Sequence, residues 1–167
     1  MKYILFAAAL IASAFASNLE VTANNFYHKD GEKKAVFSGN VVAKEEGNLI
    51  KANKITVYLD ENSEAKEYVA SGNVYFELKA PKRFIKGRCS SIRYVPIADK
   101  YFLIGNVAVE DVLNKRKIYG DEIIIDNKNG ASYAKSTKNR PVKFVFKVQS
   151  KPSKKTTKRK SKKHGKK

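Results

Sequence analysis

Residue types that build catalytic and metal centres are scarce in this chain of 167 residues. Cys89 is the only cysteine, which excludes an intramolecular disulfide, and a lone thiol is more often a small buried apolar residue than a nucleophile. The two histidines, His28 and His164, stand in no recognisable partner motif, and no Cys-x-x-Cys or His-Glu-x-x-His spacing occurs. The sequence therefore predicts that the protein is not an enzyme and needs no metal or cofactor.

An apolar run long enough to cross a membrane as a helix is also lacking. The almost entirely apolar run of residues 3–16 spans about 14 residues, whereas a membrane-spanning helix needs about 20. Lys2 precedes this run, and Ala14-Phe15-Ala16 has the small-x-small form of a signal-peptidase site. We therefore expect residues 1–16 to be a signal peptide, with an uncleaved N-terminal anchor as the alternative. Ser17 excludes a lipoprotein cysteine at the cleavage point.

Acidic residues are absent from the end of the chain. The formal net charge is +18, and the segment from Lys151 to Lys167 contributes ten Lys or Arg and no acid. Residues 17–150 carry 23 basic and 16 acidic residues and are only moderately basic. Because residues 149–167 cannot bury enough apolar surface to order themselves, we expect a disordered cationic tail. Nucleic-acid binding is the common role of such a tail, but the predicted export argues against it.

A tripeptide recurs at a fixed interval through the middle of the chain. It stands as Gly39-Asn40-Val41, Gly72-Asn73-Val74 and Gly105-Asn106-Val107, so that the glycines are 33 residues apart. A constant period of this length indicates one supersecondary unit laid down repeatedly, with neighbouring copies burying each other's apolar faces.

The sequence around these tripeptides alternates as β-strands do. In residues 74–79, for example, valine, phenylalanine and leucine alternate with tyrosine, glutamate and lysine, which gives one apolar and one polar face. A glycine at the same place in every strand predicts a bend there, which carries each strand from one layer into a second, facing layer. A second phrase begins the intervening strands: Ala23-Asn24-Asn25-Phe26, Ala52-Asn53-Lys54-Ile55, Gly120-Asp121-Glu122-Ile123 and a degenerate copy at 87–92.

Short polar turns separate the strands. They fall at residues 29–32, 60–63, 96–99 and 127–130, and two of them contain Asp-Gly or Asn-Gly. Connectors this short favour antiparallel neighbours, because parallel pairs need long crossovers. The sequence therefore predicts an all-β fold over residues 17–148: an antiparallel β-jellyroll, or two-sheet stack of bent strands, that is open at both ends.

These phrases resemble a known family, the periplasmic lipopolysaccharide-transport proteins of Gram-negative bacteria (the OstA/LptA-like family). The resemblance spans roughly residues 19–126 and includes Asp60 and Asp126, which end two of the intervening strands. It implies a twisted antiparallel β-jellyroll that binds the acyl chains of lipid A between its layers. It also implies a periplasmic location and end-to-end assembly with an inner-membrane partner and an outer-membrane assembly protein. Residues 79–99 and the lysine-rich tail depart from the family pattern.

The residues themselves allow an apolar slot between two layers. Because burial is worth about 0.8 kcal/mol per CH₂ group, such a slot could hold fatty chains without polar contacts. A plain hydrophobic core is the alternative role for each residue taken alone. The candidates are Phe26, Val41, Ile55, Val57, Leu59, Val74, Phe76, Ile92, Tyr94, Val107, Val109, Ile123 and Ile125.

Two further surfaces are candidates for contacts outside the slot. Basic residues of the divergent unit are candidates for contacts with lipid phosphates, with a solvated basic face as the alternative: Lys82, Arg83, Lys86, Arg88 and Arg93. The strands expected at residues 19–26 and 142–148 end an open sheet, so their unpaired backbone groups can accept a strand from a partner or from another copy.

Three functions remain open from the sequence. The first is a lipid bridge that carries lipopolysaccharide from the inner to the outer membrane and assembles head to tail. The second is a membrane-anchored relative of the same fold, which would keep residues 1–16. The third is a self-assembling β scaffold that binds no ligand.

Overall fold

The computed structural model describes residues 19–80, 83–136 and 141–148. Within these ranges the chain forms one antiparallel sheet of ten strands with a single short 3₁₀ helix, η1. The elements are β1 (Glu20–Thr22), β2 (Asn25–His28), β3 (Lys34–Glu45), β4 (Asn48–Leu59), β5 (Ala65–Ala80), β6 (Arg83–Val95), η1 (Pro96–Ala98), β7 (Lys100–Asp111), β8 (Arg116–Asp126), β9 (Ala131–Lys135) and β10 (Lys143–Phe146).

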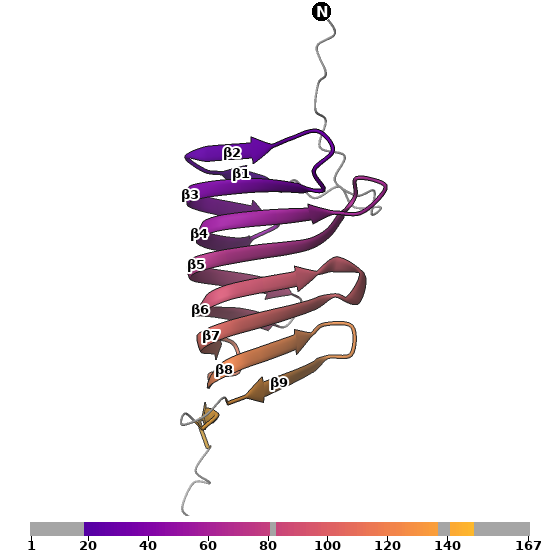
Figure 1. Ribbon diagram of the computed structural model, residues 1–167. Coiled ribbons are helices and arrows are strands. Elements are labelled where there is room, and N and C mark those ends of the chain that lie inside the picture. Colours follow the sequence, from indigo (N-terminus) through magenta and orange to yellow (C-terminus); the bar gives the residue numbers. More distant parts are fainter. Residues whose placement is uncertain (1–18, 81–82, 137–140, 149–167) are drawn as a thin grey trace, which may run out of the picture.

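Strands β3 to β8 follow one another as a meander, and each long strand is folded over so that its two halves lie in different layers (Figure 1). In the view of Figure 1, the front layer holds the first halves of β3, β5 and β7 and the second halves of β4, β6 and β8. The back layer holds the other halves. At each end of the sheet a pair of short strands completes the two layers: β2 and β1 pair with β3, and β9 and β10 pair with β8.

The repeated Gly-Asn pairs are the bends. In β3 the register with β4 skips between Ser38 and Val41, so Gly39 and Asn40 together oppose one residue of β4. Both have positive φ, at 81° and 47°, and the same holds at Gly72-Asn73 and Gly105-Asn106. Glycine adopts this left-handed backbone freely, and asparagine tolerates it better than most residues. Each repeat is therefore a β-bulge that turns the strand from one layer to the other.

The second repeated phrase supplies the partner of each bend. A Cβ at Gly72 would lie 2.8 Å from Cβ of Asn53, and a Cβ at Gly39 would lie 2.9 Å from Cβ of Asn24. At the third bend Ser90 takes this place against Gly105, with its Cβ 2.8 Å from the added atom. The small polar residue of each Ala-Asn phrase thus packs directly against the next glycine, where no side chain would fit.

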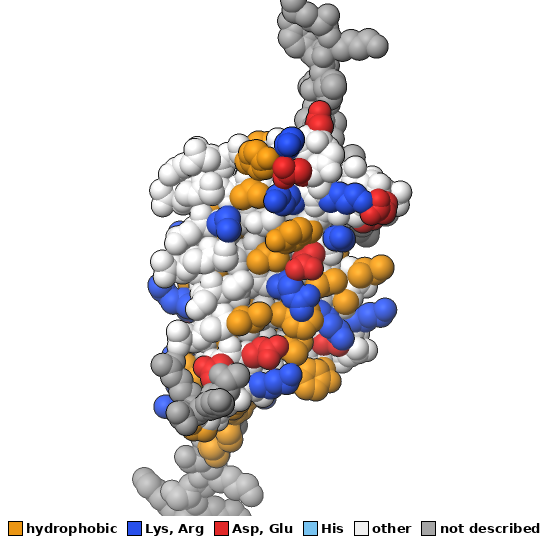
Figure 2. Space-filling model, viewed as in Figure 1, with side chains coloured by type: hydrophobic (Ala, Val, Ile, Leu, Met, Phe, Trp, Pro, Cys, Tyr) orange, Lys and Arg blue, Asp and Glu red, His pale blue; other side chains and the backbone are white. Residues whose placement is uncertain are grey.

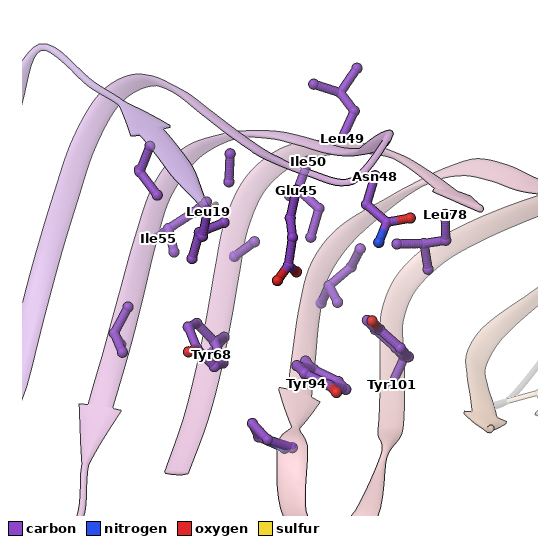
Figure 3. A pocket seen from close by; sticks show the side chains of 16 residues that line it. Leu19, Glu45, Asn48, Leu49, Ile50, Ile55, Tyr68, Leu78, Tyr94 and Tyr101 are labelled. Atoms are coloured by element: carbon purple, nitrogen blue, oxygen red, sulfur yellow. The ribbon is translucent and has the colours of Figure 1, made fainter. Parts of the chain in front are cut away.

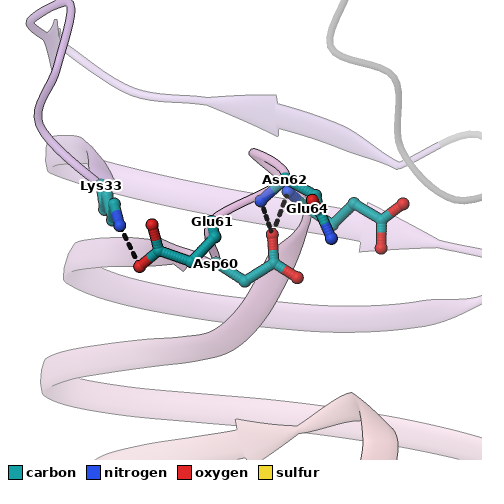
Figure 4. Close-up of polar contacts among 5 residues, drawn as sticks. All are labelled: Lys33, Asp60, Glu61, Asn62 and Glu64. Atoms are coloured by element: carbon teal, nitrogen blue, oxygen red, sulfur yellow. Dashed lines mark hydrogen bonds and ion pairs between the residues drawn. The ribbon is translucent and has the colours of Figure 1, made fainter.

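Strand ends are fixed by aspartates that accept backbone hydrogen bonds. Oδ1 of Asp60 accepts from the amide nitrogens of Asn62 and Glu64 at 2.8 and 2.9 Å, and Lys33 pairs with Glu61 beside this turn (Figure 4). Such Asx contacts stabilise a tight turn by satisfying backbone donors that leave the ladder.

The same device recurs at the end of β8. Asp126 accepts from the backbone and side-chain nitrogens of Asn129 at 3.0 and 2.9 Å, and its Oδ2 lies 3.1 Å from Nζ of Lys100. The hydrogen bond from the Asn129 side chain is the main cause that lowers the pKa of the Asp126 carboxyl.

The hydrophobic core lies between the two layers. Back-layer side chains such as Val41, Val74 and Phe76 meet front-layer side chains such as Leu103 and Ile123, and all of these are almost completely buried. Inward and outward residues largely alternate along the long strands, as expected for layers with one face in water, although Thr56 and Asp126 are buried beside inward neighbours.

The predicted all-β fold of bent antiparallel strands is confirmed, with both layers belonging to one continuous sheet. The strand expected at 19–26 is two short strands, β1 and β2, interrupted at Ala23-Asn24 and reaching His28. The strand expected at 142–148 is β10, which shares its edge with β9, a strand that the sequence did not indicate. The predicted signal peptide (1–16) and cationic tail (149–167) lie outside the described residues.

In the part of the chain that the structure describes, no helix has the length and hydropathy to cross a membrane. No group of three or more His, Cys, Asp or Glu side chains that could hold a metal ion occurs within residues 19–80, 83–136 and 141–148.

Candidate functional site

A cavity of about 360 Å³ opens between the two layers near the N-terminal end of the sheet. Its walls come from both layers and from strands β1 and β3 to β7, and Figure 3 shows the side chains converging on it. The lining is mostly apolar: Leu19, Val21, Ala43, Glu45, Asn48, Leu49, Ile50, Ile55, Val57, Tyr68, Ala70, Leu78, Ile92, Tyr94, Pro96 and Tyr101.

Four of the predicted slot residues line this cavity: Ile55, Val57, Ile92 and Tyr94. Leu59 is half-buried, and Phe26, at the outermost strand of the front layer, is 59% exposed and packs against Phe37 with 4.9 Å between ring centroids. The other predicted residues are buried in the core and do not line the cavity: Val41, Val74, Phe76, Val107, Val109, Ile123 and Ile125.

Small residues open the interior at one end and a large one fills it further along. Ala43 and Ala70 line the cavity and leave room between the layers. Next to it, the ring of Phe76 is fully buried and takes the space above Gly87. The apolar interior is therefore hollow near β3 and β4 and filled towards β8.

Three tyrosines form a row along the front wall of the cavity. Tyr68, Tyr94 and Tyr101 are direct cross-strand partners on β5, β6 and β7. The rings of Tyr94 and Tyr101 are stacked at 4.3 Å between centroids, and Tyr68 follows at 6.2 Å. The Tyr94 hydroxyl donates to Oδ1 of Asp99 at 3.4 Å.

Glu45 lines the cavity from the opposite layer, close to Asn48 (Figure 3). Burial is the main cause that raises the pKa of Tyr94 to about 12, with Asp99 and Glu45 adding to it. Burial also raises the pKa of Tyr68 and of Tyr101, again with a contribution from Glu45. All three phenols are therefore neutral hydroxyls at neutral pH, and the wall remains uncharged on that side.

The sequence did not identify the residues that make this part of the interior hollow. Leu19, Val21, Ala43, Tyr68, Leu78 and Tyr101 line the cavity but were not among the predicted slot residues. The repeat contained a usable signal, because Tyr68 and Tyr101 occupy equivalent positions, each four residues before a repeat glycine, Gly72 or Gly105.

The predicted phosphate-binding cations do not come together at the cavity. Lys86 and Arg88 lie on the outer face of the back layer, where Lys86 is 3.7 Å from Glu110. Arg93 lies on the outer face of the front layer, 4.0 Å from the centroid of the Phe102 ring. Figure 2 shows this face, where hydrophobic side chains interleave with Lys and Arg. Lys82 lies outside the described residues.

Arg83 is placed differently from the other cations. It begins β6 in the back layer, and its guanidinium donates to Oγ of Ser132 on β9 at 3.3 Å. Because β9 completes the front layer, this contact joins the two layers at the filled end of the interior.

Comparison with solved structures finds chains with a similar fold. The crystal structure of LptH, the LptA-homologous periplasmic component of the lipopolysaccharide transport device from Pseudomonas aeruginosa, matches with a TM-score of 0.68. The identity is 22%, and the match covers 78% of this chain and 96% of LptH. A search of curated protein sequences returns no significant match.

The family-level comparison covers most of the described body. The sequence profile of the LptA/(LptD N-terminal domain) LPS transport proteins matches residues 20–131, from β1 to the start of β9. This is a family of transport proteins and not of enzymes, in agreement with the sequence prediction. The bent-strand fold, its Gly-Asn corners and this match together show that the chain belongs to the LptA/(LptD N-terminal domain) family of LPS transport proteins.

Proposed function

We propose that this protein binds lipopolysaccharide by its acyl chains and carries it across the periplasm as part of a protein bridge. The observation that carries the proposal is the apolar cavity between the layers of a chain that belongs to an LPS transport family. The predicted signal peptide and the similarity to a periplasmic component support the location.

The cavity suits hydrocarbon more than a charged group. Its walls are largely aliphatic and aromatic, and the three phenols are neutral at neutral pH. Each buried CH₂ group contributes about 0.8 kcal/mol, so even part of an acyl chain gives substantial affinity. At about 360 Å³ the cavity is near the lower end of the usual range for ligand pockets, which is roughly 300–1,000 Å³. It therefore holds part of the acyl region of one lipid at a time.

The ends of the sheet supply the means of assembly. β1 and β2 at one end, and β9 and β10 at the other, are outermost strands in the described sheet. Phe144 and Phe146 on β10 are about half exposed, with 5.5 Å between ring centroids. Outermost strands of this kind pair with a further strand. The proposed partners are the inner-membrane transport complex, the outer-membrane assembly protein and further copies of this chain, joined head to tail.

Site-specific photo-crosslinking tests the lipid site. A photoreactive phenylalanine at Ala43 or Val57 places the probe in the cavity, whereas the same group at Thr22 or Tyr133 lies on exposed outer positions of the two layers. We expect lipopolysaccharide adducts in living Gram-negative cells from the two cavity positions only. Equal labelling at all four positions, or none at the cavity positions of a folded and exported protein, would refute the proposal.

A self-assembling scaffold that binds no lipid is the second candidate. The filled interior beside Phe76 favours it, because a solid core needs no ligand. The two functions differ in one readout: a scaffold gives edge-to-edge protein crosslinks without lipid adducts, and a lipid bridge gives both.

A further inference from the structure

The outer face of the back layer carries a row of cations and aromatic rings. Consecutive cross-strand partners run across five neighbouring pairs of strands, from β4 to β10. The row reads Lys51, Tyr75, Arg88, Ala108, Tyr119 and Lys143 and contains no acidic residue. Cζ of Arg88 lies 5.5 Å from the centroid of the Tyr75 ring, and Nζ of Lys143 lies 5.8 Å from the centroid of the Tyr119 ring.

A shallow depression of about 290 Å³ lies in the middle of this row. Ala108 forms part of its floor because its side chain is short where its neighbours are long. Tyr75 and Tyr119 stand on the two sides of Ala108, from β5 and β8. The complete lining is Tyr75, Lys86, Gly87, Arg88, Ala108, Val109, Glu110, Lys117 and Tyr119.

The depression is positively charged. Three cations line it, Lys86, Arg88 and Lys117, against one lining carboxylate, that of Glu110, and Glu77 is the cross-strand partner of Lys86 beside it. Glu110 is 3.7 Å from Nζ of Lys86 and 3.9 Å from Nζ of Lys117, which is longer than a hydrogen bond, so neither ammonium group is tightly held by it. Glu77, which is next to the depression, accepts a hydrogen bond from the Tyr75 hydroxyl at 2.5 Å.

We propose that this depression, defined here as the outer groove, binds an anionic saccharide whose rings carry phosphate or carboxylate groups. Tyrosine rings offer flat apolar faces with a polar edge, which suits stacking on the apolar face of a sugar ring. Arg88, Lys86 and Lys117 supply charge-assisted hydrogen bonds to the anionic groups. The open, polar shape suits a hydrated sugar better than an acyl chain. The outer groove is separate from the cavity between the layers, and its ligand binding does not depend on the proposed lipid site.

The test measures binding of fully deacylated, phosphorylated lipopolysaccharide oligosaccharide to the full mature chain by isothermal titration. We expect saturable binding, and we expect Arg88→Gln and Tyr119→Ala each to weaken it by about tenfold or more. An oligosaccharide of uronic acids distinguishes the source of the ligand: binding of that compound indicates a free acidic saccharide, and binding of the phosphorylated compound indicates the sugar part of a glycolipid. If neither compound binds, the proposal is overturned.

Arg93→Gln is the matched control variant. Arg93 is also stacked on an aromatic ring, but on the outer face of the front layer and away from the outer groove. Arg93→Gln removes one positive charge, as Arg88→Gln does. An equal loss of oligosaccharide binding in both variants would therefore show non-specific electrostatic attraction and overturn the proposal. Displacement of the oligosaccharide by an equal concentration of inorganic phosphate also overturns the proposal, because stacking of sugar rings on the tyrosines then contributes nothing to the affinity.

Two measurements separate this proposal from the lipid site and from misfolding. Arg88→Gln and Tyr119→Ala should keep the wild-type unfolding midpoint and the wild-type affinity for a fluorescent fatty-acyl probe. If either variant loses both acyl-probe binding and oligosaccharide binding, its fold is disturbed, and that result contradicts an outer groove separate from the lipid site. Failure of acyl-probe binding in the wild type, with oligosaccharide binding intact, refutes the lipid site alone.

Discussion

The ring of Phe76 fills the space that a side chain at position 87 would need. A Cβ at Gly87 would lie 2.7 Å from Cζ of Phe76 and 2.3 Å from the carbonyl oxygen of Ala108. Since the second contact is with backbone, it cannot be relieved by a rotamer change. Gly87 therefore leaves room for the ring of Phe76, which fills the interior there.

Replacing this glycine should destabilise the fold. We expect Gly87→Ala to lower the free energy of unfolding by about 2 kcal/mol or more, as overpacking of a tight core does. Urea unfolding, monitored by circular dichroism, measures this change in the free energy of unfolding. Gly120→Ala is the matched control, because a Cβ there would come no closer than 3.2 Å to the Lys135 carbonyl oxygen. If Gly120→Ala lowers the free energy of unfolding as much as Gly87→Ala does, the close contacts at Gly87 are not the cause.

The Gly-Asn bends should be equally sensitive to substitution. Gly72 has a φ of 80°, and a Cβ there would lie within 2.7–2.9 Å of three Asn53 atoms. We expect Gly72→Ala to cost about 1–3 kcal/mol, since the strained backbone and the crowding add together. Asn73→Gly at the next residue, where φ is 48°, should be close to neutral. If the two variants unfold at the same denaturant concentration, the bend does not depend on the missing side chain.

The fold could be predicted from the sequence because the positions with the strictest backbone requirements repeat. A left-handed backbone in the middle of a strand restricts the residue strongly, so Gly39, Gly72 and Gly105 recur at a constant interval and mark the bends. Their packing partners Asn24 and Asn53 recur for the same reason. By contrast, β9 was missed because its five residues form a short outermost strand in which Tyr133 points outward and is 57% exposed.

The position of the cavity could not be read from the sequence. Alternation identifies inward-facing residues but not whether the layers touch there. Val57 and Phe76 have the same inward pattern, yet the first lines a cavity and the second is part of the filled core. The difference depends on residues of other strands, such as Ala43, which lies in the opposite layer from Val57, and Gly87, which is the cross-strand partner of Phe76 in the same layer.

The thiol of Cys89 should be unreactive in the folded protein. Burial raises its pKa to about 12, and the side chain is 6% exposed. Because the thiolate is the reactive form, we expect almost no reaction with Ellman's reagent at pH 8, and full reaction in about 8 M urea, where the chain is unfolded. Rapid native labelling at a rate typical of an exposed thiol would show that the back layer opens near β6.

Filling the cavity should separate folding from lipid binding. Ala43→Phe places a ring in the cavity, where there is room for it, so we expect the free energy of unfolding to stay within about 1 kcal/mol of wild type. Binding of a fluorescent fatty-acyl probe should weaken at least roughly tenfold, because the ring occupies the space of the chain. Val42→Phe, at the preceding residue and on the outer face of the same strand, is the control and should bind normally. Normal binding by Ala43→Phe would place the lipid elsewhere.

The tyrosine row predicts a loss of stability at high pH. The pKa of Tyr94 is raised from 10.0 to about 12 and that of Tyr101 is raised as well, mainly by burial. Between pH 10 and about pH 12 the unfolded chain has released protons that the folded protein still holds, so the free energy of unfolding falls as the pH rises through this window and is fully retained below it.

Tyr94→Phe isolates the contribution of one hydroxyl group to this fall. The variant keeps the ring stacked on Tyr101 and removes the group that titrates. We expect its urea midpoint to decrease less than that of wild type between pH 9 and about pH 11.5. Lysine deprotonation affects both proteins alike and cancels in the comparison. Parallel curves for the two proteins would mean that the Tyr94 phenol ionises as readily in the folded protein as in the unfolded chain, and hence that the cavity wall is open to water.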